Sequence, residues 1–85
     1  MFQLSGELDF RRIEETRRDI RAATFADAAA IELDCATLTY LCPEAIWMLF
    51  KLGGDLAKRV VFTRMPDRCR QRIRVMGLEA SFQFR

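Results

Sequence analysis

A thiol, a proline and a carboxylate stand side by side near the middle of the chain, as Cys42, Pro43 and Glu44. Thiols and carboxylates can act as nucleophiles, acids or bases when a suitable partner lies beside them. The chain has no histidine, so it lacks the commonest general base, and a Cys-His catalytic pair is excluded. We therefore expect a protein that is not an enzyme.

The other cysteines do not extend this chemistry to a metal site. Cys35, Cys42 and Cys69 match no zinc-binding spacing, and we expect no metal and no cofactor. An odd number of cysteines without a secretory signal indicates reduced thiols and a cytoplasmic location. The longest apolar run, residues 45–50, is too short to span a bilayer, so membrane insertion is not expected.

The charge of the chain is nearly balanced, with 14 basic and 12 acidic residues and a net charge of +2. This balance gives no case for nucleic acid as a partner. Five arginines, at positions 64, 68, 70, 72 and 74, are the local exception; the last four alternate along a predicted helix and cannot share one face. We interpret them as a solvated surface, with an acidic partner or an anionic ligand as the alternative.

The elements that must position these residues can be predicted from periodicity. A chain of 85 residues is enough for one domain, residues 1–85. Alternating apolar residues predict strands over 2–4, ending at a turn or bulge at Ser5-Gly6, and over 30–35, 59–63 and 81–84.

Three helices are predicted between these strands. The first runs over 10–20 with Asp9 as N-cap, the second starts near Pro43 and ends or weakens at Gly53-Gly54, and the third covers 67–76. The side chains predicted to face inward from the first helix are Phe10, Ile13 and Ile20. The alternating order predicts an α/β fold with a small mixed, largely parallel sheet of about three to four strands and about three helices.

Four segments in this order resemble the STAS family, the domain of anti-sigma-factor antagonists and of the cytosolic tails of sulfate transporters. They are Leu4-Ser5-Gly6-Glu7-Leu8-Asp9, Ile31-Glu32-Leu33-Asp34, residues 38–46 and Met76-Gly77-Leu78. The resemblance covers almost the whole chain. It implies a regulatory module that binds proteins, and a domain that lacks the usual first strand, so that the sheet is smaller or its edge is supplied by a partner.

The same resemblance implies that a phosphorylation switch has been replaced. Family members open the second helix with a D-S-S-G-L-like turn, whose second serine is phosphorylated in antagonist proteins. Aligned without gaps from Asp34, that motif falls on Cys42, Pro43, Glu44 and Ala45. Glu44 stands at the phosphorylated position and carries a permanent charge, so any mimicry of phosphoserine would be partial. Thr37, Thr39 and Tyr40 are alternative phosphoacceptors.

We therefore expect the partner to bind near the start of the second helix, at Cys42, Pro43, Glu44, Ala45, Trp47 and Phe50. Trp47 is predicted to project outward as a binding hot spot or, alternatively, to fill a thin core. Glu44 either contacts the partner or simply complements the helix dipole. Cys42 is either a small buried hydrophobe or a redox-responsive thiol.

Two partner classes and one different function follow. The first partner is an anti-sigma kinase-like protein or another regulator in a bacterial cytoplasm. The second is the ATPase of a membrane transporter, to which the chain would be an accessory subunit. A homodimer is a further alternative, and a redox-responsive protein acting through Cys42 is the different function.

Overall fold

Four strands lie side by side in one sheet in the computed structural model, which describes residues 1–85. The sheet order is β1-β2-β3-β4, and all three pairs are parallel. The strands are β1 (Phe2–Leu8), β2 (Ala30–Leu41), β3 (Arg59–Thr63) and β4 (Gln83–Phe84). The helices between them are α1 (Ile13–Ala23), α2 (Pro43–Leu56) and α3 (Asp67–Val75). The predicted α/β fold is confirmed, and the sheet is wholly parallel.

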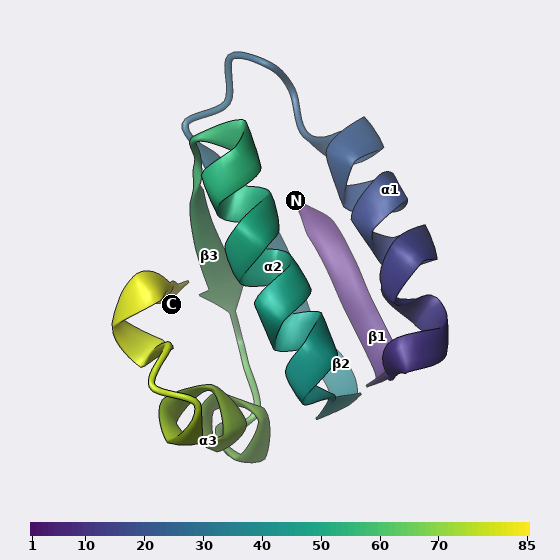
Figure 1. Cartoon of the computed structure of the whole chain (residues 1–85), viewed down its shortest axis with the longest axis vertical. Helices are drawn as coiled ribbons and strands as arrows, with labels where there is room; N and C mark the ends of the chain where they lie inside the picture. Colours follow the sequence, from purple (N-terminus) through teal and green to yellow (C-terminus); the bar gives the residue numbers. More distant parts are fainter.

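The helices α1 and α2 lie side by side against one face of the sheet, with α3 beyond its carboxyl-terminal edge (Figure 1). Leu4 and Leu8 in β1 and Leu33 in β2 face the helices and are buried. Gln3 and Glu32 point the other way and are exposed. Parallel sheets are usually covered on both faces. Here, the face turned away from the helices is polar and exposed along β1 and much of β2. We call it the open sheet face.

β1 is longer than predicted because it continues through a bulge instead of ending there. Gly6 has a φ of +66°, a conformation that favours glycine, and the register with β2 shifts on both sides of it. The Arg12 guanidinium donates to the backbone carbonyls of Ser5 and Glu7 at 3.1 and 2.7 Å. β1 is an edge strand, and a strand pairing with this part of it would compete with Arg12.

The prediction that Phe10 faces the core is wrong, because its side chain is 72% exposed. Asp9 accepts from the Arg11 N–H as predicted for a cap, but it caps a 3₁₀ turn over Phe10–Arg12. The tighter turn rotates Phe10 off the face that α1 buries. Ile20 is fully buried as expected, and Ile13 is half-buried.

Two other elements, β2 and α2, extend further along the chain than predicted. β2 runs to Leu41 instead of ending at Cys35, and its second half pairs with β1 alone. α2 continues past Gly53-Gly54 to Leu56. A Cβ on Gly53 would lie 2.9 Å from Val60 Cγ2, so this glycine allows α2 to approach β3 closely instead of ending the helix.

Candidate protein-docking face

The junction between β2 and α2 is fixed by backbone hydrogen bonds. Cys42 has an extended conformation, and its N–H donates to the Leu8 carbonyl at 3.0 Å. Its own carbonyl accepts from the N–H groups of Ala45 and Ile46. Pro43 then occupies the first helical position, where its fixed φ suits the helix and its missing N–H costs nothing. The start of α2 is thereby held at the carboxyl end of β1 and β2.

The six residues predicted to bind a partner fall into two layers. Cys42 and Ala45 are buried, with exposed fractions of 5% and 0%, so they support the surface without forming it. The other four are exposed on α2. We call them the docking face, and they are Pro43, Glu44, Trp47 and Phe50.

The aromatic part of the docking face is continuous with the core. Trp47 is 48% and Phe50 is 38% exposed, and their rings meet edge to face with centroids 5.8 Å apart. Phe50 also meets Phe82 at 6.5 Å, and Phe82 meets the buried Phe62 at 5.0 Å. The chain of ring contacts holds the exposed rings in place, so little side-chain entropy remains to be lost on binding. Of the two alternatives predicted for Trp47, the structure shows the outward orientation.

Glu44 supplies the negative charge of the docking face. It lies in the first turn of α2 and is exposed, and it belongs to none of the ion pairs within the chain. A carboxylate there complements the helix dipole. Asp34 and Glu79, in contrast, are held by arginines. Glu44 is therefore free to meet a cation on another molecule.

The thiols are unsuited to chemistry at neutral pH. All three cysteines are buried and unpaired. Burial raises the pKa of the Cys42 thiol despite its place at a helix N-terminus, and burial raises the pKa of Cys35 to about 12. Reactive cysteines have lowered pKa values and some exposure. The geometry therefore gives no support to Cys42 as a redox-responsive thiol.

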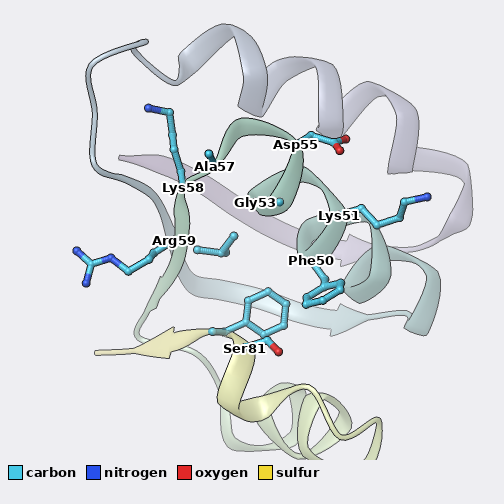
Figure 2. A pocket seen from close by; sticks show the side chains of 11 residues that line it. Phe50, Lys51, Gly53, Asp55, Ala57, Lys58, Arg59 and Ser81 are labelled. Carbon is cyan, nitrogen blue, oxygen red and sulfur yellow. The ribbon is translucent and has the colours of Figure 1, made fainter.

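A groove adjoins the docking face at the second half of α2 (Figure 2). Its volume is about 550 Å³, and Phe50 and Phe82 supply its aromatic lining. Arg59 and Lys51 extend away from each other at its borders in the same view. This groove was not predicted from the sequence, because its walls come from α2, β3 and the 3₁₀ turn at Glu79–Ser81.

Two of the four alternating arginines have a structural role. Arg70 and Arg74 both donate to Glu79, at 3.0 and 3.1 Å, and join α3 to the turn that precedes β4. These two cations lower the pKa of Glu79. Arg72 lies over the Tyr40 ring with its Cζ 4.8 Å from the centroid. This accounts for much of the basic surface without an anionic ligand.

Two observations bear on what the chain can bind. No group of three or more histidine, cysteine, aspartate or glutamate side chains is placed to hold a metal ion. No helix is both long and apolar enough to cross a bilayer.

The fold and the docking face together define a small α/β binding module with an exposed aromatic and acidic helix face. A family model described as "Mlab, STAS domain" matches residues 1–83. The chain therefore belongs to the STAS family, and it is a regulatory or binding module of that family. A comparison with curated proteins finds no sequence similar enough to be counted as a relative.

Proposed function

We propose that this STAS domain is a non-enzymatic docking module that binds a regulatory protein in a bacterial cytoplasm, with no serine phosphorylation at the usual position. The observation that carries the proposal is the exposed pair of edge-to-face rings, Trp47 and Phe50, beside the unpaired carboxylate of Glu44. Binding hot spots in protein interfaces are enriched in tryptophan, and they combine a rigid aromatic anchor with a few directed polar groups.

The partner proposed first is an anti-sigma kinase-like protein or another regulator, because the resemblance places Glu44 at the position of the regulatory phosphoserine. A fixed carboxylate cannot be removed by a phosphatase, so we propose that docking is not switched by phosphorylation at residue 44. The second partner class is the ATPase of a membrane transporter. Genes that neighbour this one distinguish the two, since regulator genes favour the first class and transporter genes the second.

The test measures binding of the purified chain to a candidate partner by isothermal titration calorimetry. Trp47→Ala should weaken binding by at least about ten-fold, as expected for a central aromatic anchor. Glu44→Gln should weaken it several-fold if the carboxylate meets a cation. Phe25→Ala is the matched control, because Phe25 is 76% exposed and lies outside α2. Equal affinities for the wild-type chain and Trp47→Ala would contradict the proposal.

A second experiment addresses phosphorylation directly. The chain is incubated with the candidate kinase and ATP and then analysed by mass spectrometry. We expect no stoichiometric phosphate on residues 37–44. Phosphate on Thr37, Thr39 or Tyr40 would show that the switch has moved along the chain, and it would contradict constitutive docking.

A further inference from the structure

We propose that the chain forms a two-fold symmetric homodimer in which α2 packs antiparallel against α2 of a second copy. The inference starts from the spacing of the exposed apolar and small residues along this helix. Pro43, Trp47, Phe50 and Gly54 are all exposed and follow one another at intervals of four, three and four residues. This alternation is the spacing by which two helices pack along a common seam. We call these four residues the α2 seam.

Gly54 is the member of the seam that the fold itself does not require. A Cβ at this position would meet nothing within 4 Å, and a glycine inside a helix is unfavourable relative to alanine. Its neighbour Gly53 differs, because a Cβ there would clash with Val60. An exposed glycine in line with two exposed rings allows another backbone to come close at the end of α2.

The two charged residues beside the seam are complementary to each other when they come from two copies of the chain. Glu44 follows Pro43 and Lys51 follows Phe50, so both lie on the same flank of the seam, seven residues apart. Both side chains are exposed, and neither belongs to an ion pair within the chain. One is an acid and the other a base, so a second, reversed copy places each opposite its counterpart.

An antiparallel arrangement satisfies the whole seam in a single register. When Trp47 of one copy lies opposite Phe50 of the other, Pro43 lies opposite Gly54, and Glu44 faces Lys51 between these two layers. The two-fold axis repeats every contact. In a parallel arrangement at the same height, by contrast, Trp47 would meet Trp47, and the flanks that carry Glu44 and Lys51 would lie on opposite sides of the seam, so these charges would not meet. Charge complementarity therefore selects the antiparallel copy.

The outer surface of α2 is accessible to a second copy. Figure 1 shows α2 at the front of the molecule with no other element passing over it. One helix pair buries less area than a standard stable interface, so the dimer is expected to be weak. Such a dimer would cover Trp47 and Phe50, so that dissociation would precede docking. This last consequence depends on the proposed function, whereas the dimer itself does not.

The test uses the purified chain alone, so its failure is distinguishable from failure of the proposed docking function. Sedimentation equilibrium is measured from about 10 µM to 1 mM, which covers the affinities of small interfaces. The wild-type chain should dimerise in this range. Glu44→Lys and Lys51→Glu should each weaken the dimer by at least about ten-fold, because each variant places like charges opposite each other twice.

Two rescue measurements separate the proposed seam from any other contact. The double variant E44K/K51E restores both opposite-charge pairs and should dimerise like the wild type. An equimolar mixture of the two single variants should form a heterodimer, because one copy then carries only lysines and the other only glutamates at these positions. Circular dichroism checks that each variant is folded. A chain that is monomeric at the highest concentration, or a dimer that the charge reversals leave unchanged, would overturn the proposal.

Discussion

Two solvent-exposed surfaces of this protein differ in the residues that they present. The open sheet face carries polar side chains such as Gln3 and Glu32, and its acidic Asp34 is paired with Arg64 at 2.6 Å. The docking face presents Trp47 and Phe50 beside the unpaired Glu44.

The difference supports the proposal that the docking face, and not the open sheet face, binds a second molecule. Polar side chains that face water, or charges that are already paired, leave nothing unsatisfied. Aromatic rings at the surface leave apolar area in contact with water. The family resemblance and the exposed aromatic rings therefore both support the proposal that a partner binds at α2.

The largest expected change in the free energy of unfolding comes from comparing a substitution on the inner side of α2 with one on its outer side. Ile46 is fully buried, and its neighbour Trp47 is on the docking face. Ile46→Ala should lower the free energy of unfolding by about 2–5 kcal/mol through lost burial and a cavity. Trp47→Ala should cost about 1 kcal/mol, mostly through the lost contact with Phe50. Urea denaturation monitored by circular dichroism measures both, and equal losses would show that Trp47 is part of the core.

Replacing the two glycines of α2 with alanine, one at a time, should change the stability of the fold in opposite directions. Gly53→Ala should destabilise the fold by about 1–3 kcal/mol, because the new methyl group overlaps Val60. Gly54→Ala should stabilise it by about 0.5–1 kcal/mol, because the methyl group enters open space and alanine favours the helix. Thermal unfolding of the two variants in parallel provides the measurement. Destabilisation by Gly54→Ala would mean that this position serves the fold after all.

The smallest expected effect on stability comes from the ion pair of the open sheet face, and it depends on pH. Arg64, followed by the Ala36 N–H, lowers the pKa of Asp34 in the folded state. This pair therefore stabilises the fold above the unfolded pKa of about 4, and the contribution is lost as the pH falls through the folded pKa. Asp34→Asn should accordingly make the free energy of unfolding less dependent on pH between about 5 and 2.

The reciprocal variant controls for the loss of the carboxylate itself. Arg64→Gln keeps Asp34 but removes the cation that lowers its pKa, so it should flatten the same acid limb. If neither variant changes the pH dependence measured by urea denaturation, the pair is fully screened by solvent and the open sheet face contributes nothing through its charges.

Much of the fold was predictable because apolar periodicity is a local property. The bounds of β3 at Arg59–Thr63 and the start of α2 at Pro43 were both predicted correctly. The outward direction of Trp47 was one of two alternatives that the sequence left open. The prediction for Phe10 was wrong because its orientation depends on a 3₁₀ turn that the helical period does not distinguish from an α-helical turn.

By itself, the sequence determined the order of strands and helices, the absence of histidine and the presence of a carboxylate at the start of α2. Each of these depends on residue type or local spacing. Only the tertiary structure decided that Cys42 and Ala45 lie beneath the docking face, that Gly53 serves packing while Gly54 does not, and that a groove adjoins Phe50. The physical reason is that burial and open space depend on residues brought together from β1, β3 and the C-terminal segment.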